Sequence, residues 1–315
     1  MKVGFIGLGA MGVPMALNLL KAGHKVSGFD VRPGAANAIT AAGGHAASSA
    51  ADAARDADLF WLMVVSGEQA ESVLFEQGAA AAMPRGAIIG LGCTQAPAHA
   101  ARTAERLAVM GLHTLDAPVS GGTKGANAAA LTIMCSGDEA VLQRARPVLD
   151  AMGSRVFDCG RAPGMGSTAK MINQLLCGVH IAAAAEAMHL AERAGVSTAT
   201  MHEIISVSAG NSWMWGDRGP RMMQSDPPVT SAVDIFVKDL GIVLGQAREL
   251  KAGLPLSAAA MQMFLAASGL GHGAADDSQV IRAYRALNGA GPSTGSGPST
   301  GSGPSTGAGP STGSG

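Results

Sequence analysis

The stretch Met1-Lys-Val-Gly-Phe-Ile-Gly-Leu-Gly-Ala-Met-Gly12 decides the fold of this chain. A short β-branched and aromatic run, typical of a buried strand, leads directly into Gly7, Gly9 and Gly12. In a dinucleotide-binding turn of this spacing, Gly7 permits the tight turn out of the strand and Gly9 lets backbone N–H groups approach a pyrophosphate. Gly12 allows the next helix to pack closely on the sheet. The stretch therefore predicts a strand, a phosphate-binding turn and a helix.

The residues that follow support this interpretation. A helical stretch over 13–22 leads to Gly23 and then to a second strand over 25–29 that ends at Asp30. Asp30 lies 18 residues beyond Gly12, near the spacing at which a carboxylate accepts hydrogen bonds from an adenosine ribose. An acid there repels a 2′-phosphate, so NAD is favoured over NADP, although Arg32 leaves NADP as the less favoured alternative. A purely structural glycine turn in some other βαβ unit is the competing interpretation.

Composition and charge limit the possible partners. Apolar residues make up 47% of the 315 residues and charged residues 14%, which favours two domains with large cores. A net charge of −1 without a basic stripe argues against nucleic acid or an anionic membrane surface as a partner. We find no export signal before the first strand and no apolar run of membrane-spanning length, so we expect a cytoplasmic protein. The cysteines are scattered without zinc-site spacing, so we expect buried, reduced thiols and no metal site.

The pattern of elements changes once along the chain. Up to about residue 160, short β-branched runs at 59–65, 86–89, 131–134 and 155–157 alternate with alanine-rich helical stretches. This alternation predicts an α/β domain with a Rossmann-type, doubly wound, mostly parallel sheet. Beyond Gly166 only helices are predicted, over 167–194, 198–209, 231–251 and 255–270. We therefore divide the chain into a dinucleotide-binding domain (1–162), an all-helical domain for substrate and oligomer contacts (163–290) and a Gly-Pro-Ser-Thr repeat tail (291–315), expected to be disordered.

The helix predicted over 167–194 is apolar on nearly all sides. A helix without a polar face has to be covered by other helices or by a second subunit. We therefore expect a homodimer or a homotetramer. His180, Glu186, His189 and Glu192 share this helix but lack the i, i+4 histidine pair of helical zinc sites, so His180 is interpreted as a core or interface residue. Trp213 and Trp215 suit either a pocket or core packing.

Two further motifs carry polar groups suited to binding and chemistry. Asp116-Ala-Pro-Val-Ser-Gly-Gly-Thr-Lys-Gly125 ends a buried strand, where Ser120 offers a hydroxyl and the N–H groups of Gly121 and Gly122 can bind a carboxylate. A plain glycine turn is the alternative. In Gly166-Ser-Thr-Ala-Lys-Met-Ile-Asn173, Lys170 and Asn173 project from one face of an apolar helix, where burial without a purpose is costly. The alternative there is a lysine that extends to solvent.

In this order and at these separations, the three motifs resemble the β-hydroxyacid dehydrogenase family, over residues 1 to about 288. The resemblance implies that Lys170 is the catalytic acid/base, that Asn173 contacts the reacting oxygen, and that Ser120, Gly121 and Gly122 hold the substrate carboxylate. It also implies that Ser231 lies on the polar side of the substrate pocket. Finally, it implies these contacts to the cofactor NAD: Gly7, Leu8, Gly9, Ala10, Met11, Gly12, Asp30, Val31, Val64, Thr94 and Lys238.

The amino-acid sequence over 173–186, 210–214 and 231–239 looks most like the L-threonate branch of that family. Three positions depart from the common pattern: Cys93, Ala129 and Gln174, the last where many members have a second asparagine. The resemblance implies NAD-dependent oxidation of a small hydroxy acid, best L-threonate to its 2-oxo acid, with 3-hydroxyisobutyrate or tartronate semialdehyde as alternative substrates. A dinucleotide-binding sensor without turnover is the remoter alternative. As a base Lys170 has to be neutral, which burial and the positive nicotinamide ring both favour.

Overall fold

The central sheet of the protein has six parallel strands. In the computed structural model, which describes residues 1–288 and 313, they lie in the order β3-β2-β1-β4-β5-β6. Their bounds are β1 (Lys2–Ile6), β2 (Lys25–Phe29), β3 (His45–Ala46), β4 (Leu59–Leu62), β5 (Ile88–Leu91) and β6 (His113–Asp116). The order reverses between β1 and β4, and ligands of open α/β sheets bind at the carboxyl ends of the strands at such a point. The predicted Rossmann-type sheet is confirmed.

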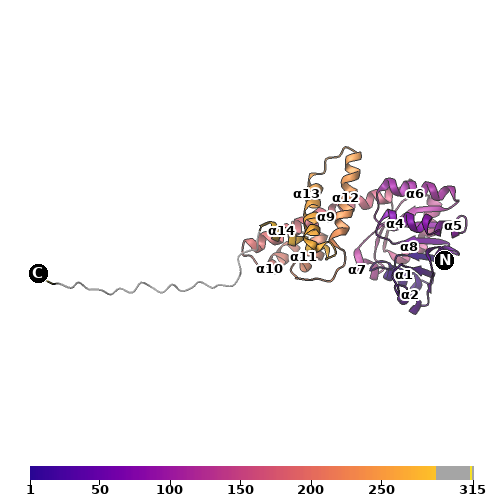
Figure 1. Cartoon of the computed structure of the whole chain (residues 1–315), viewed down its shortest axis with the longest axis horizontal. Helices are drawn as coiled ribbons and strands as arrows, with labels where there is room; N and C mark the ends of the chain where they lie inside the picture. Colours follow the sequence, from indigo (N-terminus) through magenta and orange to yellow (C-terminus); the bar gives the residue numbers. More distant parts are fainter. Residues whose placement is uncertain (289–312, 314–315) are drawn as a thin grey trace.

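Helices cover both faces of this sheet because successive side chains of each strand point to opposite faces. Phe5 and Trp61 pack into one core with α1 (Gly12–Lys21) and α8 (Glu139–Met152). Ile6 and Phe60 pack into the other with α3 (Ala50–Ala54) and α6 (Pro97–Val109). Figure 1 shows α1, α6 and α8 around the sheet, on the side of the N-terminus. The other helices of this part are α2 (Asn37–Ala41), α4 (Gly67–Glu71), α5 (Ala79–Ala82) and α7 (Gly122–Asn127), with a π-helical turn η1 (Ser72–Glu76).

A second, smaller sheet extends the first part of the chain. It consists of β7 (Val119–Ser120), β8 (Thr132–Cys135) and β9 (Arg155–Asp158). The pair β7 and β8 is antiparallel, whereas β8 and β9 are parallel. A bridge between Asp116 and Ser136 joins the end of β6 to the end of β8. The two sheets together therefore have mostly parallel pairings.

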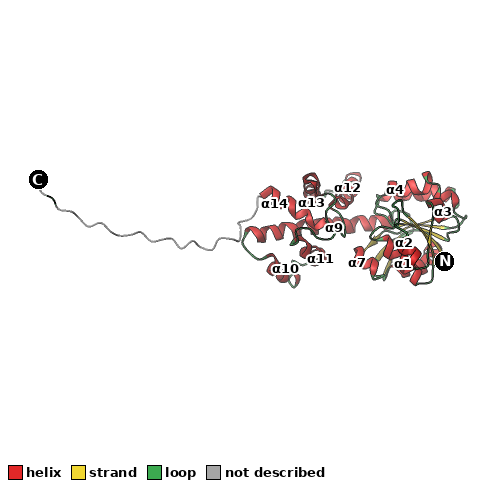
Figure 2. Cartoon of the chain, turned by 60° about the horizontal axis from the view of Figure 1, so that its bottom comes forward, coloured by secondary structure: helices red, strands yellow, loops and turns green. Residues whose placement is uncertain are grey.

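One long helix, α9 (Met165–Arg193), connects the sheet region with the helical region, as Figure 2 shows. The helices that pack with it are α10 (Thr198–Ser206), α11 (Trp213–Met222), α12 (Val233–Glu249), α13 (Pro255–Ala267) and α14 (Ile281–Asn288), with short turns η2 (Ser268–His272) and η3 (Asp277–Val280). They share one apolar core that includes Ile181, Met188, Trp215, Phe236 and Phe264. The described chain thus has an all-helical second part, as expected.

The length and composition of α9 would let it cross a membrane, contrary to our expectation that no segment has this length. In this structure 44% of its most apolar window is buried inside the protein. The same character is expected of a central core helix that several others surround. The helix therefore has a structural explanation that requires no membrane.

Other predicted elements differ in their ends. The strand expected over 59–65 ends at Leu62, and the helix expected over 198–209 ends at Ser206. Helix α11 was not expected, since Gly216, Gly219 and Pro220 all disfavour a helix. It forms because Ser212 Oγ accepts a hydrogen bond from the N–H of Trp215 and because one face is buried in the helical core. The repeat tail predicted for 291–315 lies outside the described residues except for Gly313.

Candidate active site

The glycine turn after β1 has the geometry that its three glycines predict. Gly7 has φ of +90°, and a Cβ there would lie 2.3 Å from the carbonyl oxygen of Met63. A Cβ on Gly12 would lie 1.8 Å from the carbonyl oxygen of Gly7, so only glycine lets α1 begin this close to the strand. At Gly9 the nearest atom to an added Cβ is a guanidinium nitrogen of Arg32 at 3.8 Å. The backbone at Gly9 is therefore open toward a ligand, and Ala10 and Met11 follow it into the first turn of α1.

Asp30 lies at the end of β2 beside this turn. Its carboxylate accepts hydrogen bonds from the N–H of Leu8 at 2.8 Å, from the N–H of Arg32 at 2.9 Å and from Arg32 Nε at 3.0 Å. The hydrogen bond from the Arg32 side chain is the main reason that the pKa of Asp30 lies below its ordinary value. Asp30, Val31 and Arg32 line a cavity of about 270 Å³. A paired carboxylate beside an open cavity fits an adenosine ribose, and Arg32 lies close enough to influence the choice of cofactor.

The start of α9 is fastened to the end of β6 by Asp116. This carboxylate, fully buried, accepts hydrogen bonds from the N–H groups of Gly164 at 3.1 Å and Ser167 at 2.7 Å, and from Ser167 Oγ at 2.7 Å. Burial raises the pKa of Asp116, although these donors oppose the rise. A Cβ on Gly166 would lie 2.4 Å from the carbonyl oxygen of Met134 and 2.5 Å from that of Asp116. Asp116 and Gly166 therefore fix where the first turn of α9 lies.

Lys170 follows one turn later and is buried, with an exposed fraction of 7%. Its Nζ donates a hydrogen bond to Gln174 Oε1 at 2.8 Å. Asn173 donates from Nδ2 to the same oxygen at 2.9 Å and to Cys177 Sγ at 3.4 Å. Burial lowers the pKa of Lys170, with a smaller opposing contribution from the negative charge of Asp239. Lys170 thus has the environment in which a lysine side chain can act as a base.

The same network reaches the cofactor-binding part of the chain. Gln174 Nε2 donates to Asp239 Oδ2 at 2.5 Å, and Lys238 of α12 forms an ion pair with Asp239. Lys238 Nζ also donates to the carbonyl oxygen of Thr94, in the loop after β5, at 3.3 Å. The structure therefore brings together Lys170, Asn173, Thr94 and Lys238 from the predicted site.

Three members of this arrangement were not predicted as site residues. Asp116 stands at the head of the second motif, Gln174 was noted only as a departure from the common pattern, and Asp239 follows Lys238 directly. Their places in sequence were therefore visible. Their partners were not, because Gln174 of α9 and Asp239 of α12 are 65 positions apart in the chain and meet only when the two helices pack together.

The predicted carboxylate-binding residues do not join the side-chain network of Lys170. Ser120 ends β7, and Gly121 and Gly122 have φ of +123° and +59°, which glycine adopts readily. A Cβ on Gly122 would meet no atom within 4 Å, so its backbone faces open space. Val64 lies in the loop after β4. These positions stay predictions about substrate and cofactor contacts.

Ser231 lies just before α12, where its carbonyl oxygen accepts a hydrogen bond from the N–H of Asp277 at 2.7 Å. Asp277 is fully buried and accepts two hydrogen bonds from the Arg218 side chain, at 2.9 and 2.8 Å. Arg218 itself is also buried, with an exposed fraction of 8%. The position of Ser231 therefore depends on a buried ion pair that the sequence did not indicate.

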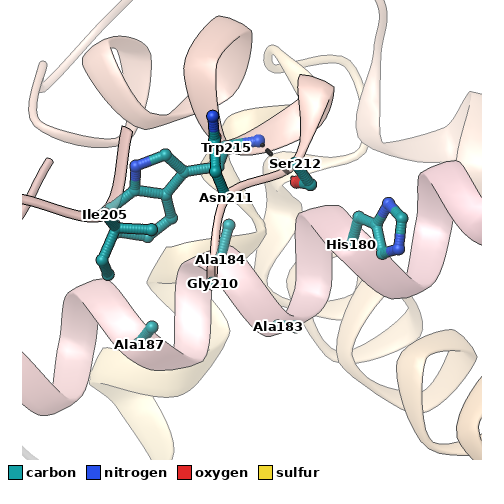
Figure 3. A pocket seen from close by; sticks show the side chains of 9 residues that line it. All are labelled: His180, Ala183, Ala184, Ala187, Ile205, Gly210, Asn211, Ser212 and Trp215. Atoms are coloured by element: carbon teal, nitrogen blue, oxygen red, sulfur yellow. Dashed lines mark hydrogen bonds between the residues drawn. The ribbon is translucent and has the colours of Figure 1, made fainter. Parts of the chain in front are cut away.

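A separate cavity of about 190 Å³ lies in the helical part, among α9, α10 and α11 (Figure 3). His180 and Trp215 line it, together with Asn211 and Ser212. His180 stands ten residues after Lys170 on α9, about 15 Å along the helix axis. Trp215 is buried and stacks on His202, whereas Trp213 is 59% exposed. The cavity is thus distinct from the surroundings of Lys170.

Comparison with known proteins defines the class of this protein. Residues 2–160 match the family described as the NAD binding domain of 6-phosphogluconate dehydrogenase. Residues 164–284 match the family described as NAD-binding of NADP-dependent 3-hydroxyisobutyrate dehydrogenase. The chain is 47% identical over 287 residues to L-threonate dehydrogenase of Cupriavidus necator, covering 91% of this chain and 97% of that protein. It is 42% identical to L-threonate dehydrogenase of Escherichia coli K12, covering 90% and 95%.

A solved structure shares the fold over nearly its whole length. The crystal structure of 3-hydroxyisobutyrate dehydrogenase from Salmonella typhimurium superposes with a TM-score of 0.85 at 45% identity, covering 89% of this chain and 98% of that one. The chain belongs to the β-hydroxyacid dehydrogenase family, as its three motifs predict. It is an NAD-dependent dehydrogenase of hydroxy acids.

Proposed function

We propose that this enzyme oxidises L-threonate, or a closely similar four-carbon sugar acid, to the corresponding 2-oxo acid. The observation that carries the chemistry is the buried Lys170, whose Nζ is held by Gln174 beside the cofactor-binding part of the chain. The L-threonate dehydrogenases at 42% and 47% identity support the choice of substrate. Ser231 supports it as well, because a small hydroxyl side chain suits a polyhydroxylated acid better than an aromatic one would.

In the proposed reaction, Lys170 Nζ accepts the proton of the substrate hydroxyl while the carbon–hydrogen bond at the same carbon breaks. NAD, when bound, supplies the acceptor for the hydride that leaves this carbon. Lys170 starts neutral, which its burial favours. It ends as an ammonium that donates a hydrogen bond to Gln174 Oε1. The negative charge of Asp239 favours that ammonium as it forms.

The remaining predicted residues orient the reactants. The glycine turn over 7–12 and Asp30 would hold the dinucleotide, with Thr94 and Lys238 near its reactive end. The backbone at Gly121 and Gly122, with Ser120, would bind the substrate carboxylate. Asn173 would donate a hydrogen bond to the reacting oxygen. For this, its Nδ2 has to give up the hydrogen bond to Gln174 Oε1 or use the other hydrogen of the amide. Orientation of this kind lowers the barrier because the reacting atoms already meet in the right geometry.

The test is a substrate panel assayed for NADH formation at 340 nm, with L-threonate, its stereoisomers, 3-hydroxyisobutyrate and the reduced form of tartronate semialdehyde. We expect the highest kcat/KM for L-threonate, and Lys170→Ala should lower kcat by at least about 100-fold with little change in NAD affinity. The name of the Salmonella relative makes 3-hydroxyisobutyrate the second candidate. A higher kcat/KM for it would overturn the substrate assignment, and a near-normal kcat in Lys170→Ala would overturn the mechanism.

We also propose a soluble, cytoplasmic homodimer or homotetramer. On α9, Ile172, Leu176 and Leu190 stay 54%, 50% and 68% exposed within the single chain. Large apolar side chains left exposed on one helix favour contact with a second subunit. Light scattering of the full chain tests this, and a monomeric mass at micromolar concentration would rule it out.

A further inference from the structure

Lys170 is linked to the cofactor-binding part of the chain through a continuous series of side-chain contacts. Lys170 Nζ donates to Gln174 Oε1 at 2.8 Å, and Gln174 Nε2 donates to Asp239 Oδ2 at 2.5 Å. Asp239 pairs through its other oxygen with Lys238, which donates to the carbonyl oxygen of Thr94 at 3.3 Å. Gln174 is the only member of this series that contacts Lys170 directly.

The amide of Gln174 has one satisfactory orientation. Its Oε1 faces two donors, Lys170 Nζ and Asn173 Nδ2, while its Nε2 faces the Asp239 carboxylate. The reversed amide would turn its NH₂ group toward two donors and its oxygen toward a carboxylate. Gln174 is 8% exposed and Asp239 2% exposed, so no bulk water would compensate for that mismatch. Asp239 therefore fixes Gln174, and Gln174 fixes the nitrogen of Lys170.

We propose that Gln174 is a positioning residue that holds Lys170 Nζ in place and couples it to the charges of Asp239 and Lys238. The proposal rests on the role of Lys170 as the base in the proposed function. A neutral amine that donates one hydrogen to Gln174 Oε1 keeps its lone pair free for the substrate proton. A shorter asparagine at this position would not reach both Lys170 and Asp239 from the same backbone, which gives the glutamine of this chain a specific purpose.

Charges of both signs surround Lys170, so removing different neighbours should shift its pKa in different directions. The negative charge of Asp239 raises its pKa, burial and the positive charge of Lys238 lower it, and Cys177 favours the ammonium form. Loss of Asp239 or of the Gln174 acceptor should thus lower the pKa, and loss of Lys238 should raise it. Damage to the local packing alone would not produce shifts of both signs.

The experiment titrates Lys170 in the full chain without cofactor, using ¹³Cε-labelled lysine and NMR, with Lys170→Arg to assign the signal. We expect Gln174→Met and Asp239→Asn each to lower the Lys170 pKa, and Lys238→Met to raise it. Because Gln174 and Asp239 act in series, the shift in the double variant should be smaller than the sum of the two single shifts. Gln246→Met, which changes a partly exposed glutamine of α12 bonded to Glu249, is the matched control and should leave the titration unchanged.

An unchanged Lys170 titration in Gln174→Met, or additive shifts in the double variant, would overturn the proposal. If Gln174→Met does not fold, Gln174→Asn provides the same test, since the shortened amide should also lower the pKa. In active variants, the pH at which kcat falls on the acid side should move in the same direction as the titration. Failure of the proposed function would give a different result. Near-normal turnover in Lys170→Ala would contradict the role of Lys170 as the base. The Lys170 titration is measured without cofactor or turnover, so it tests the role of Gln174 separately.

Discussion

The close approach of α9 to the sheets can be tested by a single methyl group, in Gly166→Ala. The new Cβ would lie 2.4 Å from the carbonyl oxygen of Met134 and 2.5 Å from that of Asp116, both backbone atoms. Relief to a contact of 3.0 Å requires the first turn of α9 to move by about 0.6 Å, the difference between the two distances. Forced overpacking of this kind costs about 1–3 kcal/mol of unfolding free energy, or several degrees in Tm.

The same displacement should reach Lys170, which lies one turn further along α9. A misplacement approaching 1 Å can lower a rate by about 100-fold, so we expect kcat to fall about 10- to 100-fold while KM for NAD changes little. Urea unfolding of Gly166→Ala measures the loss of unfolding free energy, and steady-state kinetics on the same preparation measure the fall in kcat. Any movement of α9 also strains the hydrogen bonds between Ser167 and Asp116, which adds to the loss of stability.

Gly245→Ala is the matched control. Gly245 is exposed within α12, and a Cβ there would meet no atom within 4 Å. Since alanine favours a helix over glycine, this variant should be more stable by about 0.5–1 kcal/mol and fully active. The reasoning is refuted if Gly166→Ala keeps the wild-type stability and kcat, or if Gly245→Ala loses as much as Gly166→Ala.

Three further predictions concern charges. Burial lowers the pKa of Lys170, so between its folded pKa and its ordinary value near 10.4 the unfolded chain binds more protons and stability rises with pH. Lys170→Met should therefore be more stable than wild type in urea at neutral pH, and the gain should shrink above about pH 10.4. Asp30→Ser frees Arg32 to pair with a 2′-phosphate and should narrow the preference for NAD in kcat/KM; wild-type preference for NADP would contradict our view of Asp30. Arg218→Met leaves the Asp277 charge buried and should cost about 3–5 kcal/mol, most of which the double change with Asp277→Leu should restore in urea unfolding.

Local sequence was sufficient for the cofactor-binding turn and the order of the elements. Gly7 turns the chain with a φ of +90°, and Gly12 packs against the carbonyl oxygen of Gly7 within the same turn. Both are local features, so the spacing of the glycines alone reveals them. The change from strands to helices after residue 160 was readable because hydrophobic periodicity is itself a local property. Helix α11 was missed because tertiary burial of Trp215 and its neighbours outweighs the local cost of two glycines and a proline.

The sequence by itself thus determined the family, the sheet and the residue types that the chemistry requires, with Lys170 as the proposed base. Only the tertiary structure decided what surrounds that lysine. Gln174 and Asp239 meet across α9 and α12, and Lys238 meets Thr94 across 144 positions of the chain. The physical reason is that proton affinity depends on burial and on charges within a few ångströms, and those distances exist only after distant segments have packed together.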